Sequence, residues 1–149
     1  MSHDPSETFR RYLSAMVINS LATAEAAGLN ATDYYALNLL DLGGPLSSGE
    51  LAQHTGLTTG ATTRLIDRLE KGGHVRRVPD PHDRRKVIVE SAGQPTGLAE
   101  VLSGTRRRLA GVFDDLTEAE RALVFAYFRR ATDAYQEATA ELVAARPGA

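Results

Sequence analysis

The chain has 149 residues, the size of a single domain, and a formal net charge of -2 at pH 7. It contains no cysteine, which excludes disulfides, thiolate metal sites, cysteine nucleophiles and thiol-based redox sensing. The longest apolar run, residues 123–128, is far shorter than the ~20 residues of a membrane span, and the N-terminus lacks the order of a signal peptide. We therefore expect one soluble, cytoplasmic domain, residues 1–149, with no membrane contact.

The first part of the chain is predicted to form two helices. Residues 5–27 place apolar side chains at spacings of three and four, the period of an amphipathic helix. Thr32 is the predicted N-cap of a second helix. The sequence Gly-Gly-Pro at 43–45 ends this second helix, because neither residue type continues a helix well.

Two further helices are predicted to be joined by a sharp turn. Ser47 and Glu50 have the spacing of a capping box, which starts a short third helix at about 48–55. Thr58 is the predicted N-cap of a fourth helix, which ends at the glycine pair 72–73. Two helices joined by a short glycine-containing turn, with a strand pair directly after the second, are typical of a winged helix-turn-helix.

The strand pair is predicted at 74–78 and 87–90, on either side of the charged turn PDPHDRRK at 79–86. Two prolines stiffen the approach to this turn, and Asp83 can fix an arginine through a charge-assisted hydrogen bond. A β-wing that carries arginine has the right shape to enter a minor groove. The alternative is a solvated hairpin tip. The candidate wing residues are His82, Asp83, Arg84, Arg85 and Lys86.

The rest of the chain is predicted to form two long helices, one at about 96–114 and one that starts at a capping box at 117–120. Residues 29–92 thus form the winged helix-turn-helix region, flanked by helical regions at 5–28 and 94–146. We expect the flanking helices to pack with each other and with a second copy, because a C₂ dimer gains a second DNA half-site. The alternative is a monomeric bundle that covers its own apolar faces.

Charge is distributed unevenly along the chain. Residues 1–57 have 2 Lys and Arg against 6 Asp and Glu, a net charge of -4, and residues 91–149 have 7 against 8, a net charge of -1. Residues 58–90 have 8 against 5, a net charge of +3. A basic centre between acidic flanks favours a polyanionic partner, since phosphate neutralisation supplies much of nucleic-acid affinity. The alternative is an ordinary solvated surface.

The fourth predicted helix has one face suited to a major groove. At 100° per residue, Leu65 and Leu69 face the core, with Thr62 near them, while the opposite face carries small residues, hydroxyls and an arginine. Small residues allow close approach, a threonine methyl can meet a thymine methyl, and arginine can bind guanine through two hydrogen bonds. The candidate DNA-contact residues are Thr58, Thr59, Gly60, Thr62, Thr63, Arg64 and Lys71.

Gly60 has two interpretations. Glycine inside a helix costs about 1 kcal/mol relative to alanine. Either the glycine lets the backbone approach DNA closely, or it is a tolerated defect in a first turn that frays.

Catalysis is not expected, and we predict no catalytic residue, cofactor or metal. The stretch GLTTGATT at 56–63 lacks the lysine and the preceding strand of a phosphate-binding loop. The histidines, at positions 3, 54, 74 and 82, lack the spacing of metal ligands. Zinc binding through histidines and distant carboxylates stays an alternative.

A winged-helix module that binds protein instead of DNA is the main functional alternative. Such a module would be expected to carry apolar residues on the exposed face of residues 58–71, where this chain has threonine, arginine and lysine. Sequence-specific DNA binding is therefore the preferred interpretation.

From LNATDYYALNLL (29–40) through the wing, the sequence resembles the MarR family of bacterial transcriptional regulators, and TTRLIDRLEKGGHVRRVPDPHDRRK (62–86) is a specific match. LTEAERALVFAYFRRAT (116–132) resembles that family's last helix. The resemblance implies a mainly α (α+β) fold of six helices with a wing between the fourth and fifth, and long terminal helices that form a homodimer. It also implies that helix 58–71 reads the major groove of operator DNA, and that Arg85 enters the minor groove, oriented by Asp83. Members usually repress promoters and release DNA when a small, often aromatic or anionic, effector binds.

A ligand pocket between the first two helices is a further hypothesis, because aromatic and methionine side chains occur in both. The candidate residues are Tyr12, Met16, Tyr34 and Tyr35. The alternative is that they belong to the apolar core. VESAGQPTG (89–97) departs from the family pattern, because its glycines and proline predict a looser start to the fifth helix and a looser coupling of wing and dimer arm.

Overall fold

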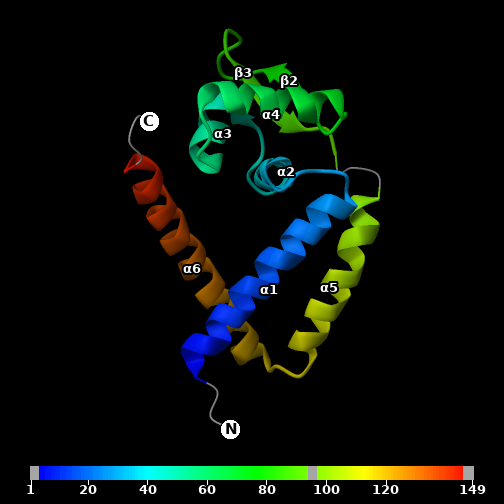
Figure 1. The fold of residues 1–149 in the computed structure, drawn as a ribbon, viewed down its shortest axis with the longest axis vertical. Coiled ribbons are helices and arrows are strands. Elements are labelled where there is room, and N and C mark those ends of the chain that lie inside the picture. Colours follow the sequence, from blue (N-terminus) through cyan, green and yellow to red (C-terminus); the bar gives the residue numbers. More distant parts are fainter. Residues whose placement is uncertain (1–3, 94–96, 146–149) are drawn as a thin grey trace.

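The computed structural model describes residues 4–93 and 97–145 of the chain (Figure 1). A small winged-helix lobe is preceded by one long helix and followed by two, of which the first extends away from the lobe and the last runs back toward it. The mainly α (α+β) architecture agrees with the sequence prediction. The elements are α1 (Pro5–Ala26), α2 (Ala31–Gly43), β1 (Leu46–Ser47), α3 (Ser48–Thr55), α4 (Thr59–Lys71), β2 (Val75–Pro79), β3 (Val87–Ser91), α5 (Leu98–Asp114) and α6 (Glu118–Ala144).

Side-chain caps fix where most helices begin. Ser47 and Glu50 form the predicted capping box of α3, and the same reciprocal arrangement starts α6. Thr58 caps α4, with its hydroxyl accepting from the amide of Ala61 at 3.3 Å. The predicted cap of α2 is wrong. Asn30, not Thr32, has the extended backbone of an N-cap and accepts from the amide of Asp33 at 2.9 Å, so α2 begins earlier.

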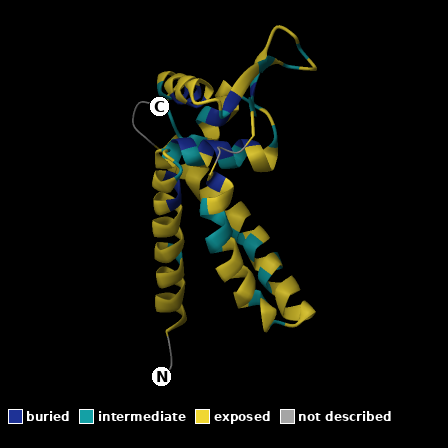
Figure 2. Ribbon diagram, turned by 90° about the vertical axis from the view of Figure 1, so that its right-hand side faces the viewer, coloured by how far each residue is buried: buried dark blue, intermediate teal, exposed yellow. Residues whose placement is uncertain are grey.

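The lobe holds the main hydrophobic core. Its buried cluster draws on α2, α3, α4 and two strands, and Figure 2 shows the buried positions gathered in this part of the molecule. The members of the cluster are Ala36, Leu37, Leu40, Leu51, Leu65, Ile66, Leu69, Val75 and Val89. This core sets the position of α4 against the sheet.

The wing is part of a three-stranded antiparallel sheet of order β1-β3-β2. The hairpin of β2 and β3 was predicted. In the observed register Arg77 lies opposite Val89. No sequence pattern indicated β1, a strand of two residues that pairs Leu46 with Val89. Because β3 is central, β2 is an edge strand whose outer side faces α4.

The long helices leave much apolar surface uncovered. Phe113 of α5 stacks on Phe125 of α6 at a centroid distance of 5.5 Å, which closes the corner between the two helices. Along the rest of α6, no residue is buried in the part of the helix that the structure describes, and Figure 2 shows α1, α5 and α6 as mostly exposed. No helix among the described residues is long and apolar enough to cross a membrane.

The fifth helix begins at Leu98, two residues later than predicted. Gly97 lies at its N-cap with φ 92° and provides no side-chain cap, in keeping with a weak helix start. The remainder of the predicted loose segment, residues 94–96, lies outside the described residues, and the predicted looseness of coupling stays a prediction.

Candidate nucleic-acid interface

The buried face of α4 anchors it in the lobe. Leu65, Ile66 and Leu69 are buried in the core cluster. Thr62 was a candidate contact residue, but it is only 1% exposed and its hydroxyl donates to the Thr58 carbonyl at 3.0 Å. The side chain is buried and its hydroxyl bonds within the helix, so Thr62 does not belong to the exposed face.

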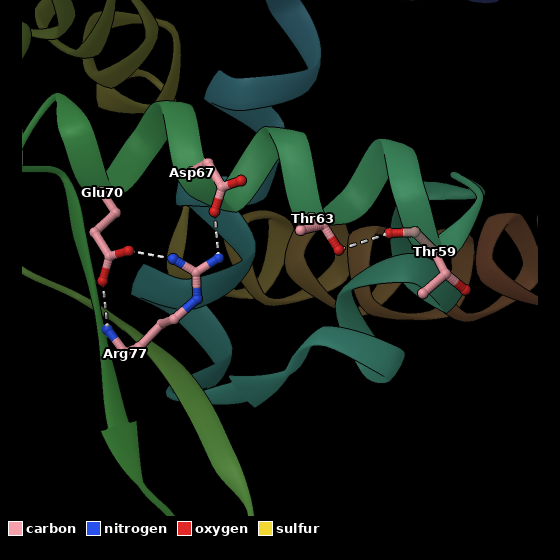
Figure 3. Close-up of polar contacts among 5 residues, drawn as sticks. All are labelled: Thr59, Thr63, Asp67, Glu70 and Arg77. Carbon is pink, nitrogen blue, oxygen red and sulfur yellow. Dashed lines mark hydrogen bonds and ion pairs between the residues drawn. The ribbon is translucent and has the colours of Figure 1, made fainter.

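The exposed N-terminal half of α4 brings the other candidates together. Thr59, Gly60, Thr63 and Arg64 are all exposed, and Thr58 precedes them as the cap. The Thr63 hydroxyl donates to the Thr59 carbonyl at 3.0 Å (Figure 3), so it can meet a ligand only as an acceptor or through its methyl group. The face thus offers small residues, acceptors and one guanidinium.

The surroundings of Gly60 do not require a glycine. A methyl group added there would have the guanidinium of Arg64 as its nearest neighbour, at 3.9 Å, which is ordinary contact. Gly60 is also absent from the described glycines with positive φ. No internal packing reason therefore explains the residue, and both interpretations of Gly60 stay open.

Lys71 lies apart from this group. It is the last residue of α4 and is exposed, which puts it about 18 Å along the helix axis from Thr59 at 1.5 Å per residue. It extends the basic surface but does not join the cluster at the N-terminal end.

Two acidic residues on the same helix had no role predicted from the sequence. Asp67 and Glu70 both contact Arg77 of β2, with 2.6 Å between the Arg77 guanidinium and Asp67 Oδ1 (Figure 3). The hydrogen bond with Asp67, aided by the charge of Glu70, raises the pKa of Arg77 above its ordinary value. The Arg77 guanidinium is therefore bonded to α4 through both carboxylates.

The wing tip is shaped by two aspartates. Asp83 accepts from the Arg85 backbone amide at 3.2 Å and from its Nε at 3.3 Å, so the contact predicted for Asp83 is present. The Arg85 side chain is 92% exposed, and Arg84, Lys86 and His82 are also exposed. The tip therefore presents its cations outward.

Asp80 is the second of these aspartates, and its sequence position alone predicted no role for it. Its carboxylate accepts from the amides of His82 at 2.7 Å and Asp83 at 3.4 Å. These bonds to the charged form lower the pKa of Asp80 below its ordinary value. An aspartate whose side chain can accept from the amide two residues further on is a recognised turn signal, and this signal could have identified Asp80.

A second ion pair ties α4 to α2. Arg68 forms two hydrogen bonds with Asp33, at 2.7 and 3.1 Å. The Asp33 side chain is only 6% exposed whereas that of Arg68 is 51% exposed. Asp33 also occupies the first turn of α2, where the helix dipole favours a carboxylate. Helix α4 is thus bonded to α2 as well as to β2.

The candidate pocket residues divide between two cavities. Met16, Tyr34 and Tyr35 line a cavity of about 220 Å³ between α1 and α2. Tyr12 lines a second cavity of about 260 Å³ between α1 and α6, which Met16 also borders. Tyr12, Met16 and Tyr35 are each about half exposed. These three side chains are therefore not buried within the single chain, and both interpretations of them stay open.

Within residues 4–93 and 97–145, no three His, Cys, Asp or Glu side chains gather into a group that could hold a metal ion. The exposed half of α4 and the wing tip together form a polar and cationic surface.

Comparison with known proteins identifies the fold and the family. The chain is 36% identical over 132 residues to the uncharacterized HTH-type transcriptional regulator YcgE of Bacillus subtilis (strain 168), covering 88% of this chain and 86% of the relative. A model of the MarR family matches residues 27–86. The chain belongs to the MarR family. The MarR prediction and the prediction of a non-enzymatic transcriptional regulator with a DNA-binding winged helix are thereby confirmed.

Solved structures agree with the MarR fold. A MarR-like transcriptional regulator from Thermotoga maritima is 28% identical, with a TM-score of 0.61 and coverage of 89% of this chain and 97% of that one. A single-residue mutant of S. aureus MepR bound to an oligodeoxyribonucleotide is 17% identical, with a TM-score of 0.59 and coverage of 90% and 99%. At that identity, the second likeness concerns the fold alone.

Proposed function

We propose that this MarR-family protein is a homodimeric repressor that binds a pseudo-palindromic operator and releases it when a small ligand binds. The observation that carries the proposal is the exposed N-terminal half of α4 beside an arginine-tipped wing. In this arrangement α4 enters the major groove through Thr59, Gly60, Thr63 and Arg64, and the wing brings Arg85 to the adjacent minor groove. MepR, which shares the fold, is bound to an oligodeoxyribonucleotide in its solved structure.

Uncovered apolar surface on the long helices supports the homodimer. Ile18 of α1, Val112 of α5 and Leu123 of α6 are each about two-thirds exposed or more in the single chain. Apolar surface of this extent on three neighbouring helices is typical of a protein–protein interface. A second copy, related by a two-fold axis, covers it and places two copies of α4 at two half-sites.

The α1–α2 cavity supports a small effector. Its lining of Met16, Tyr34 and Tyr35 is largely apolar with two phenolic hydroxyls, a combination that suits a small aromatic molecule with a polar group. Because α2 is also bonded to α4 through Asp33 and Arg68, a ligand that shifts α2 shifts the recognition helix with it.

Fluorescence-anisotropy titrations against duplexes that tile the promoter of the protein's own gene test the proposal. The expected result is tight binding to one pseudo-palindromic tile, with an affinity that falls linearly with salt on logarithmic axes. Arg64→Ala and Arg85→Ala should each weaken that binding by ~1–3 kcal/mol while the dimer stays folded. Two results would instead favour a winged helix that binds protein. One is binding that does not depend on salt, and the other is no binding to any promoter tile or to any sequence selected genome-wide.

A further inference from the structure

Two carboxylates occupy the exposed surface of the helix that the proposed function directs at DNA. Asp67 and Glu70 lie on α4 with 57% and 40% of their side chains exposed. Negative charge beside a polyanion opposes association, because the charges repel across the interface. Their presence on this helix therefore requires an explanation other than DNA contact.

Arg77 of β2 binds both carboxylates at once (Figure 3). One guanidinium nitrogen lies 2.6 Å from Asp67 Oδ1, and another donates to Glu70. The backbone amide of Arg77 also donates to Glu70 Oε1 at 3.2 Å. Three hydrogen bonds thus join one residue of the wing strand to one side of the recognition helix.

The backbone bond shows how the wing is held. Since the strand order is β1-β3-β2, β2 is an edge strand with unpaired amides on its outer side. Glu70 satisfies the amide of Arg77 on that side, so α4 acts as the neighbour that β2 otherwise lacks. The hairpin is consequently fixed to α4 along its free edge as well as to β1 through β3.

We propose that Arg77 is a positioning residue that fixes the wing to α4, so that the recognition helix and the wing tip reach neighbouring grooves as one unit. The inference rests on the proposed function, because it assigns Arg77 to the same DNA-reading surface. We call the hydrogen bonds of Arg77 with Asp67 and Glu70 the clamp. The two carboxylates hold Arg77 in place, and Arg77 acts through Arg85 at the tip without contacting DNA itself.

Arg76 provides a matched control on the same strand. It carries the same charge, lies one residue away, and pairs with Glu90 of β3 within the hairpin. Arg76→Ala therefore removes a cation from β2 without releasing the hairpin from α4.

A double-mutant cycle on the operator duplex tests how Arg77 acts. Arg77→Ala should weaken operator binding at least tenfold, and Arg76→Ala less than threefold. Arg85→Ala should cost at least tenfold in the natural and Arg76→Ala backgrounds but less than threefold in the Arg77→Ala background, because an unclamped wing no longer delivers Arg85. Additive losses for Arg77 and Arg85 would overturn the proposal and make Arg77 an independent contact.

Substitution of Asp67 and Glu70 gives a second test, because the loss of negative charge and the loss of the clamp predict opposite changes in operator affinity. The double variant Asp67→Asn, Glu70→Gln removes two negative charges, so charge alone predicts tighter binding to every duplex. The clamp predicts weaker binding to the operator together with tighter binding to a random duplex of the same length. Tighter binding to both would overturn the proposal.

Hydrogen exchange in the free protein separates this inference from the proposed function. The amides of residue 80 and residues 82–86 should exchange at least fivefold faster in Arg77→Ala than in Arg76→Ala, with thermal midpoints that match. Equal exchange overturns the clamp whether or not the protein binds DNA. Faster exchange in a protein that binds no duplex would sustain the clamp and refute the DNA-binding proposal.

Discussion

Replacing Gly60 by alanine separates the two interpretations of this residue. Gly60 is the second residue of α4, and alanine is favoured over glycine in a helix by up to about 1 kcal/mol. The added methyl group meets no atom closer than 3.9 Å, so no clash offsets the gain. We expect the free energy of unfolding to rise by roughly 0.5–1 kcal/mol, at or below the full propensity difference because the position is close to a helix end.

The effect on DNA should have the opposite sign. If the backbone at Gly60 approaches the groove closely, a methyl group there holds the helix away from the bases, and operator affinity should fall about tenfold, or ~1.4 kcal/mol. Thermal unfolding measures the first effect, as a rise in midpoint of about 1–4 °C, and anisotropy with the operator measures the second.

Gly49→Ala is the matched control for this experiment. Gly49 is the second residue of α3, and a methyl group there also has its nearest neighbour at 3.9 Å, the hydroxyl of Ser47. It should raise stability by a similar amount with a smaller effect on affinity. A Gly60→Ala protein that is more stable and binds the operator as tightly as the natural protein would refute close approach and leave the tolerated defect as the explanation.

Other substitutions test three individual contacts. Thr62→Val should leave operator affinity within twofold in anisotropy titrations, because the side chain is buried and its hydroxyl bonds to Thr58. Asp80→Ala should weaken operator binding by loosening the wing tip, whereas Asp80→Asn, which keeps an acceptor oxygen but loses the charge, should weaken it less. Since the bonds to the charged carboxylate lower the pKa of Asp80, the tip should keep its protection from hydrogen exchange at neutral pH and lose part of it only as the pH falls below the ordinary range of a carboxyl. Arg68→Ala should lower the free energy of unfolding by roughly 1–2 kcal/mol in urea denaturation, a value reduced from that of a fully buried pair because Arg68 is half exposed, and Asp33→Asn in that background should recover part of the loss.

Local signals in the sequence predicted most of the fold. Capping boxes at Ser47 and Thr117 located the starts of two helices, because each requires only residues three apart. The helical period separated the core side of α4 from its exposed side. Thr62 was assigned to both, since a threonine at the edge of a helical wheel satisfies either environment, and only its burial decides between them.

Contacts between distant segments could not be predicted in the same way. Asp33 and Arg68 are 35 residues apart, and nothing in their local patterns distinguishes them from other surface charges. The clamp on Arg77 depends on β2 being an edge strand, which follows from the position of the two-residue strand β1. The candidate pocket was divided because α1 contributes side chains to two different neighbours, α2 and α6.

Site-directed crosslinking tests most directly the claim that α4 and the wing together read DNA. The natural chain has no cysteine, so each introduced cysteine carries a photoactivatable label at one known position. Labels at Thr59→Cys and Arg84→Cys should crosslink to the operator at separate positions, the first within the major groove and the second at the neighbouring minor groove. A label at Asp114→Cys, at the end of α5 far from the lobe (Figure 1), should not crosslink. Crosslinks from Asp114→Cys with none from Thr59→Cys or Arg84→Cys would contradict the account.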